Sequence, residues 1–206
     1  LEREQAQKNR IKNDLQSKEK QLRKSIKDKE KQTKNLDRQI QNIILAETAP
    51  KKDASTGKTY ELTPSEIKLT SSFASNKGKL PWPTERGVIS ETFGVHNHPV
   101  LKKVKTKNNG INILTSKNSE ARAVFSGKVV SITTISNTNI AVIVKHGEYF
   151  TVYSNLDKVF VSRGDEIETK EIIGRIHTNL KGKTELHFEI WRGSSIQNPS
   201  YWVQKK

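Results

Sequence analysis

The stretch KVVSITTISNTNIAVIVKHGEYFTVY, residues 128–153, decides the fold of this chain. Its apolar residues are mainly β-branched or aromatic, and they fall into three short runs at 128–135, 140–146 and 149–153. Side chains of this kind favour strands, and a tight turn such as His146-Gly147-Glu148 joins antiparallel neighbours. The stretch therefore predicts three consecutive antiparallel strands.

Similar short runs lie on both sides of this stretch, and no helical pattern of useful length separates them. They occupy residues 88–93, 110–114, 121–125, 172–176 and 186–191. A series of strands without alternating helices is typical of a mainly antiparallel sheet and not of a βαβ fold. We expect residues 80–206 to form one β domain.

Residues 1–46 differ in composition, because they contain no Gly, Pro, Trp, Tyr or Phe. They predict one long helix with an apolar heptad pattern, interrupted at Lys12, Glu19, Lys29 and Thr33. The d positions hold Leu15, Leu22, Leu36 and Ile43, and the a positions hold Ile26 and Ile40. We interpret the helix as one arm of an antiparallel coiled-coil hairpin, and a single solvated helix is the alternative. Because no cap precedes Leu1, we expect the natural chain to continue upstream, so the lack of a signal peptide does not bear on location.

A shorter helix is predicted after a polar linker at residues 51–59. Thr63-Pro64-Ser65-Glu66 combines a capping Thr, Pro at the first helical position and Glu three residues after the cap. Asn76-Lys77-Gly78 ends this helix, whose apolar residues are Ile67, Leu69 and Phe73. The predicted fold is α+β, with a coiled-coil arm at 1–46, a linker with the short helix at 47–79, and the β domain at 80–206.

The chain carries a formal net charge of +15, which favours anionic partners such as nucleic acid, lipid headgroups or cell-wall polymer. A surface solubilised by lysine explains the same charge. No helix-turn-helix, zinc-finger or ribonucleoprotein motif is present, so we do not expect a nucleic-acid partner. The chain has no Cys, which excludes disulfides and thiolate chemistry. No apolar run approaches the roughly 20 residues of a membrane span.

About ten short motifs follow one another in the β domain and together resemble the M23 family of zinc peptidases, of the lysostaphin/LytM type, across residues 87–203. They are Arg86–Gly94 with Val95–Pro99, Asn108-x-Gly110-x-Asn112, Ala123–Val129, Lys145-His146-Gly147, Thr151–Leu156, Gly164-Asp165, Ile173-Gly174, Glu185–Glu189 and Asn198-Pro199-x-x-Trp202.

The resemblance implies a site whose metal-binding residues have been replaced. In active members, a His-x-Gly-x-Asp motif supplies two zinc ligands, the second His of a later His-x-His supplies the third, and two further His assist catalysis. Here Asn108 and Asn112 stand at the first two ligand positions, Glu185 and Asn155 replace the catalytic His residues, and only His187 remains.

These replacements predict a domain that is not an enzyme. A hydrolytic zinc site needs three imidazole, thiolate or carboxylate ligands and a bound water, and carboxamides are poor substitutes. Without the metal, nothing lowers the pKa of the water, and the usual proton-transferring imidazoles are missing. We therefore expect no metal, no other cofactor and no catalytic residue. His96 and His98, on a predicted loop, do not restore the ligand set.

The order of arm, linker, short helix and degenerate domain is similar to the family of murein hydrolase activators. That resemblance implies a periplasmic protein of cell division. Its degenerate domain would activate N-acetylmuramoyl-L-alanine amidases, and its coiled coil would engage an FtsEX-type ABC transporter. Peptidoglycan itself is a further candidate partner. The alternatives are a peptidoglycan-binding scaffold and an active zinc endopeptidase with an unusual ligand set.

By the same resemblance, partner binding would use the groove of the former active site. The groove residues are Asn108, Asn112, Tyr153, Asn155, Glu185 and His187. A helical segment within 51–76 would restrain this groove, with Ile67, Leu69 and Phe73 in or beside it. The alternative is that the short helix packs on the outside of the β domain.

Overall fold

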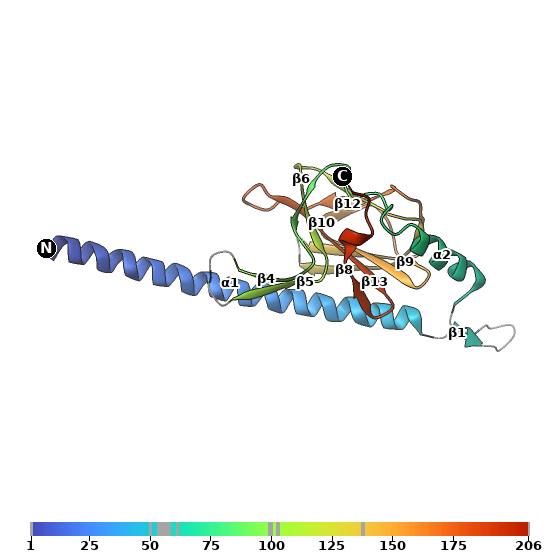
Figure 1. The fold of residues 1–206 in the computed structure, drawn as a ribbon, viewed down its shortest axis with the longest axis horizontal. Helices are drawn as coiled ribbons and strands as arrows, with labels where there is room; N and C mark the ends of the chain where they lie inside the picture. The colour runs from blue at the N-terminus through green and yellow to red at the C-terminus, as the bar shows by residue number, and fades with distance from the viewer. Residues whose placement is uncertain are drawn as a thin grey trace.

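The computed structural model describes residues 2–49, 51–52, 59–60, 62–98, 101, 104–136 and 139–205. It contains the long helix α1 (Glu2–Thr48), the short helix α2 (Pro64–Ser75) and a β domain (Figure 1). The predicted α+β fold, with two helices ahead of an antiparallel sheet, is therefore confirmed. Residues 53–58 of the predicted linker lie outside the described residues.

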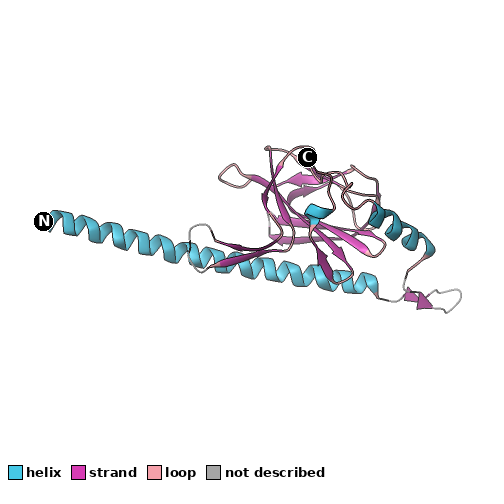
Figure 2. Ribbon diagram, in the orientation of Figure 1, coloured by secondary structure: helices cyan, strands magenta, loops and turns pink. Residues whose placement is uncertain are grey.

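The β domain is built on one large antiparallel sheet (Figure 2). Its central path runs β11-β8-β9-β10-β13-β6-β3, and β12, β7 and β14 pair at its margins. These strands are β3 (Val88–Glu91), β6 (Ile111–Thr115), β7 (Glu120–Arg122), β8 (Gly127–Ser136), β9 (Asn139–His146), β10 (Tyr149–Val159), β11 (Glu166–Ile167), β12 (Ile172–Ile176), β13 (Thr184–Arg192) and β14 (Ser195–Gln197).

Two short ribbons and one 3-10 turn complete the fold. The ribbons pair β1 (Lys51–Lys52) with β2 (Thr59–Tyr60), and β4 (Gly94–Asn97) with β5 (Lys105–Asn108). The turn η1 (Pro199–Tyr201) follows β14. The β4–β5 ribbon was not predicted, because its residues are mostly polar and lack the apolar alternation that marks a strand.

Alternation along the strands gives the sheet two apolar faces. The first face carries the main core, which includes Tyr153, Phe188 and Ile190. The second face carries a separate buried cluster: Val130, Ala141, Ile143, Phe150, Val152 and Trp191. A sheet with two apolar faces needs a covering layer on each, because exposed apolar area of this size is costly in water.

The C-terminal part of α1 covers the second face. Leu36, Ile40 and Ile44 recur every four residues, so they lie on one side of the helix, and all three are buried in the second cluster. The N-terminal part extends away from the domain, as Figure 1 shows, and Ile11 and Leu15 are more than half exposed. The residues of the predicted heptad seam thus have two environments, one packed on the sheet and one in solvent.

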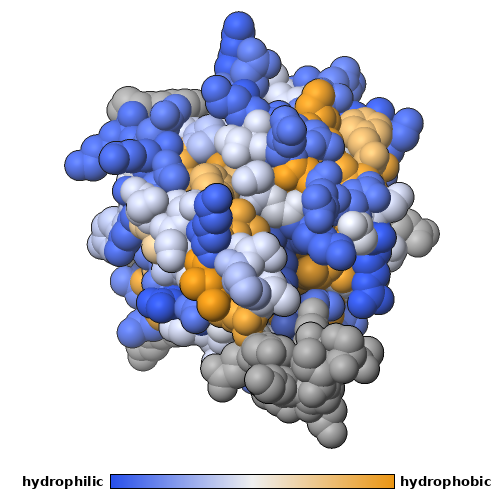
Figure 3. Space-filling view, turned by 90° about the vertical axis from the view of Figure 1, so that its right-hand side faces the viewer, coloured by the Kyte–Doolittle hydropathy of each residue, from blue (hydrophilic) through white to orange (hydrophobic). Residues whose placement is uncertain are grey.

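Helix α2 begins as predicted, with a complete capping box. The Thr63 side chain accepts from the Glu66 amide, and the Glu66 carboxylate accepts from the Thr63 amide at 2.8 Å. Phe73 is fully buried and stacks on His146 and Tyr149, with ring centroids 4.9 and 4.8 Å apart. The α2 end of the molecule is otherwise mostly hydrophilic, with separate small apolar areas (Figure 3).

We predict that Ile40→Ala loosens α1 without unfolding the β domain. Truncating a buried Ile costs about 2–5 kcal/mol, and here the loss falls on the contact between α1 and the sheet. Hydrogen exchange should accelerate at residues 34–48 and stay unchanged in β10 and β13. The matched control is Leu15→Ala on the exposed part of the same helix, which should leave both regions unchanged. Equal acceleration in β10 would contradict separate docking of the helix.

Candidate functional site

Two of the three positions that hold zinc ligands in active M23 peptidases face each other on neighbouring strands here. Asn112 on β6 pairs in register with His187 on β13. Asn112 Nδ2 donates to Glu91 Oε2 at 2.8 Å, which turns its Oδ1 towards the imidazole. His187 Nδ1 lies 2.6 Å from that Oδ1, and Nε2 lies 2.8 Å from Glu189 Oε1.

Both ring nitrogens of His187 therefore face acceptors, and both must donate. This arrangement requires the protonated imidazolium form. Burial alone would lower the pKa of His187, but the hydrogen bond and charge of Glu189, with the charges of Asp37 and Glu91, raise it. Because a metal ligand must present a free nitrogen lone pair, the network opposes metal binding even at the one retained ligand position.

Glu189 is itself held in place from its other side. It is almost fully buried, and Trp191 Nε1 donates to its Oε2 at 2.6 Å. His187, Glu189 and Trp191 alternate along β13, so all three side chains lie on the second face, which α1 covers. This alternation is visible in the sequence, and it could have identified Glu189 as a site residue that motif comparison missed.

Asn155 and Glu185 are also brought together, beside the central pair. Asn155 occupies a bulge in β10 at a φ of 68°, a left-handed conformation that Asn tolerates better than most residues. Its Nδ2 donates to the Glu185 carbonyl oxygen at 2.5 Å. The Glu185 carboxylate accepts from the Ser90 hydroxyl and pairs with Lys183 Nζ at 2.7 Å. These groups form a polar rim with mixed charge.

Asn108 lies at the start of the turn that leads into β6. Its Oδ1 accepts from the Gly110 amide at 3.0 Å, and its side-chain Nδ2 is buried without a partner. A Cβ at Gly110 would lie 2.1 Å from the Phe188 carbonyl oxygen, so this turn packs directly on β13. The neighbouring Asn109 Nδ2 donates to Asp37 Oδ2 at 2.7 Å.

Asp37 is the residue that brings α1 into the site. Burial raises the pKa of Asp37 and the charge of Glu189 raises it further, while the Asn109 hydrogen bond and the charges of His187 and Lys107 lower it. Because the pKa of Asp37 is raised when α1 is docked, protonated Asp37 is the form that docking favours. Docking is therefore most stable at low pH and becomes less stable as the pH rises through the pKa of Asp37. Neither Asp37 nor its partner was identified from the sequence, because the contact spans 72 residues.

Tyr153, another predicted groove residue, lies on the opposite face of the sheet. It pairs with Phe188, one position away from the pair Ser154 and His187, so its ring enters the main core. Its hydroxyl accepts from the Val124 amide at 3.0 Å, and burial raises its pKa to about 12. This hydroxyl supports the core and does not face Asn112.

The three residues of the predicted restraining helix, Ile67, Leu69 and Phe73, are all on α2. Phe73 stacks on Tyr149, five residues along β10 from the position opposite His187. At about 3.3 Å per residue, that separation is roughly 16 Å. The structure thus places α2 at the far end of the β9–β10 hairpin, whereas α1 packs on the sheet face that carries His187 and contacts Asn109 through Asp37.

Throughout the described ranges, no group of three or more His, Cys, Asp or Glu side chains is arranged to hold a metal ion. In the same ranges, no helix is long and apolar enough to cross a bilayer. The three ligand positions hold two carboxamides and one imidazole whose two nitrogens are both hydrogen-bonded. These groups do not fit the tetrahedral zinc site of a hydrolase.

Residues 106–199, which include most of the sheet and the site, match the model of peptidase family M23. Two crystal structures share the fold. A zinc-containing peptidase from Vibrio cholerae is 21% identical with a TM-score of 0.52, over 63% of this chain and 41% of that one. Csd3 of Helicobacter pylori is 24% identical with a TM-score of 0.51, over 62% and 35%.

Among curated proteins, the chain is similar to the murein hydrolase activator EnvC of Escherichia coli K12. The two are 26% identical over 196 residues, which cover 92% of this chain and 45% of EnvC. The chain therefore spans less than half the length of that relative, and the similarity includes the helices as well as the domain.

We predict that the purified chain binds well below one equivalent of zinc. The double change Asn108→His with Asn112→Asp, which restores the ligand types of active relatives, should raise zinc binding towards one equivalent. Adding His187→Ala should abolish that gain. The measurement is metal content after dialysis against buffered zinc. Stoichiometric zinc in the unaltered chain, lost on His187→Ala alone, would restore the endopeptidase interpretation.

Proposed function

We propose that this protein is a non-catalytic activator of peptidoglycan amidases, and that α1 restrains it by covering the surface that binds the amidase. The observation that carries the proposal is the docking of α1 on the sheet face that presents Asn112 and His187. Asp37 contacts this surface, and Leu36, Ile40 and Ile44 bury the adjoining apolar cluster. The similarity to EnvC, whose name describes a murein hydrolase activator, supports the same function.

The docked helix and an amidase would compete for one surface. Three buried aliphatic side chains contribute roughly 5–9 kcal/mol of gross burial energy, before the entropy of ordering the helix is subtracted. An amidase that binds only when α1 is undocked has an apparent affinity proportional to the fraction of molecules in which α1 is undocked. A force or ligand that draws α1 away would therefore switch the protein on.

By this proposal, the exposed N-terminal part of α1 is the segment on which an FtsEX-type transporter acts, in the periplasm. Residues 1–46 carry 13 basic and 7 acidic residues and leave Ile11 and Leu15 in solvent, so they are available to a partner. Peptidoglycan, which is anionic, is a second ligand that the net charge of +15 favours.

The test is an amidase assay on dye-labelled sacculi with the chain alone, the amidase alone and both mixed. Ile40→Asp with Ile44→Asp places two charges in the buried cluster, so it should undock α1 and increase activation at least tenfold relative to the unaltered chain. Ile11→Asp with Leu15→Asp is the matched control on the exposed part of the helix and should not increase it.

A pull-down distinguishes the two helices as restraining elements. Removing residues 1–48 leaves α2 in place, whereas removing residues 1–79 deletes both helices. If α1 restrains the site, both truncations bind the amidase equally and more tightly than the whole chain. Strong binding only after removal of residues 1–79 would assign the restraint to α2, and equal binding by all three forms would remove restraint altogether.

A further inference from the structure

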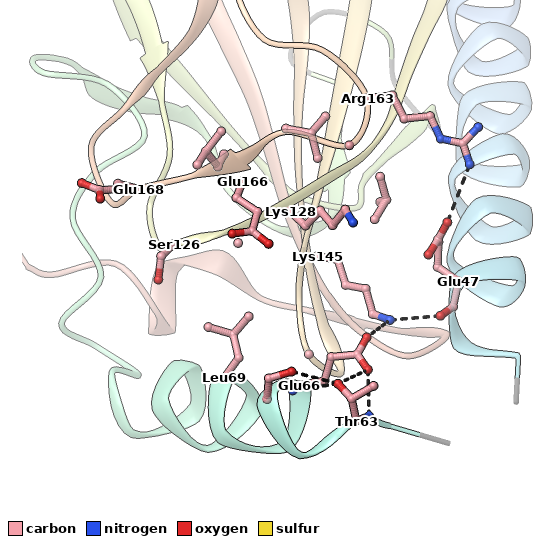
Figure 4. A pocket seen from close by; sticks show the side chains of 17 residues that line it. Glu47, Thr63, Glu66, Leu69, Ser126, Lys128, Lys145, Arg163, Glu166 and Glu168 are labelled. Atoms are coloured by element: carbon pink, nitrogen blue, oxygen red, sulfur yellow. Dashed lines mark hydrogen bonds and ion pairs between the residues drawn. The ribbon is translucent and has the colours of Figure 1, made fainter. Parts of the chain in front are cut away.

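The motif Lys145-His146-Gly147 at the end of β9 is not used by the site, yet each of its residues contacts a helix. The Lys145 side chain is only 8% exposed. Its Nζ donates to Glu66 Oε1 on α2 at 2.6 Å and to the Glu47 carbonyl oxygen on α1 at 3.2 Å. One buried cation therefore bridges the sheet and both helices, as Figure 4 shows.

The other two residues of the motif fix α2 to the hairpin. His146 stacks on Phe73. A Cβ at Gly147 would lie 2.0 Å from Thr70 Oγ1 and 2.4 Å from the Glu66 carbonyl oxygen, so only Gly permits this approach. Thr70 Oγ1 also accepts from the hairpin amide of Glu148 at 2.9 Å. These contacts make α2 a part of the β domain.

Glu66 connects this fixed helix to the lysine. One carboxylate oxygen completes the capping box and the other pairs with Lys145. Burial alone would raise the pKa of Glu66, but hydrogen bonds from Lys145 and Thr63 lower it to about 2. The ordinary pKa of a Glu side chain is 4.5, so the contribution of the pair to stability is complete above about pH 4.5 and is lost as the pH falls through about 2.

Lys145 also supplies what the end of α1 lacks. The last four carbonyls of a helix have no partner within it, and a cation there offsets the negative end of the helix dipole. Helix α1 has no basic residue in its last turn, and Glu47 lies in that turn. Arg163 is a further cation near Glu47, but it is mostly exposed and 3.8 Å away, so it contributes much less.

The contact lies at the edge of an open pocket of about 1020 Å³. The ends of both helices, β8, β9 and residues 163–168 line it (Figure 4). This open space beside Lys145 leaves room for the end of α1 to move without disturbing the main core.

We propose that Lys145 is a latch, which ties the end of α1 to the fixed helix α2 and thereby biases α1 towards its docked position over the site. The latch rests on the proposed function, in which α1 restrains partner binding. It assigns different roles to the two helices: α2 is the anchor and α1 is the element that moves.

The test is Lys145→Met in the whole chain, because Met keeps the length and apolar stem of Lys and removes the cation. We expect hydrogen exchange at residues 34–48 to accelerate about tenfold, the scale of one charged hydrogen bond. Exchange in α2 and β13 should not change. Glu66→Gln should accelerate α1 similarly, and the double variant should add little, because both changes remove the same contact. Arg175→Met is the control, since it breaks an exposed pair with Asp157 that touches neither helix.

Each outcome separates the latch from the proposed function. Unchanged exchange of α1 in Lys145→Met and Glu66→Gln overturns the latch, and the proposed function stands if Ile40→Asp with Ile44→Asp still increases amidase activation. Faster exchange of α2 together with α1 also overturns it, because α2 would then not be an anchor. If no variant activates an amidase, the proposed function is wrong. The hydrogen exchange of residues 34–48 still shows whether Lys145 holds α1 in place. If Lys145→Met does not fold, the same measurement is made on Glu66→Gln alone, because Glu66 is the more exposed residue of the pair.

Discussion

The arrangement of this protein depends on one contact, the packing of Leu36, Ile40 and Ile44 against the second face of the sheet. One face of the sheet is buried in the main core, and the other face carries the second apolar cluster. Here the chain covers it with its own helix. By the proposed function, access to that surface depends on the position of the helix.

The site near this contact has a different donor set from that of a zinc peptidase. Here Asn112, His187 and Glu189 form a hydrogen-bonded network, and Asp37 of the helix binds the neighbouring Asn109. The imidazole has acceptors at both nitrogens, so it serves as a charge partner and not as a ligand.

Two kinds of contact hold α1 on the sheet, namely apolar burial and polar contacts. The apolar cluster supplies most of the energy and has no directional preference, since hydrophobic burial depends on area. The Asp37 contact near the middle and the Lys145 contact at the end are directional, and they set the register of α1 on the sheet. By the proposed function, a force on the ends of this helix would release it without unfolding the domain.

The sequence alone determined the two helices, the antiparallel sheet and the loss of the ligand set. The apolar period of 1–46, the capping box at Thr63 and the β-branched runs of 128–153 are local patterns, and the Asn residues at 108 and 112 are read directly. Only the tertiary structure decided that α1 lies on the Asn112–His187 surface while α2 packs at the other end of the hairpin, and that Tyr153 faces the core. The amphipathic pattern of a helix indicates that one side will be buried, but it does not specify the surface that buries it, because contacts such as Asp37 to Asn109 and Lys145 to Glu66 join residues far apart in the chain.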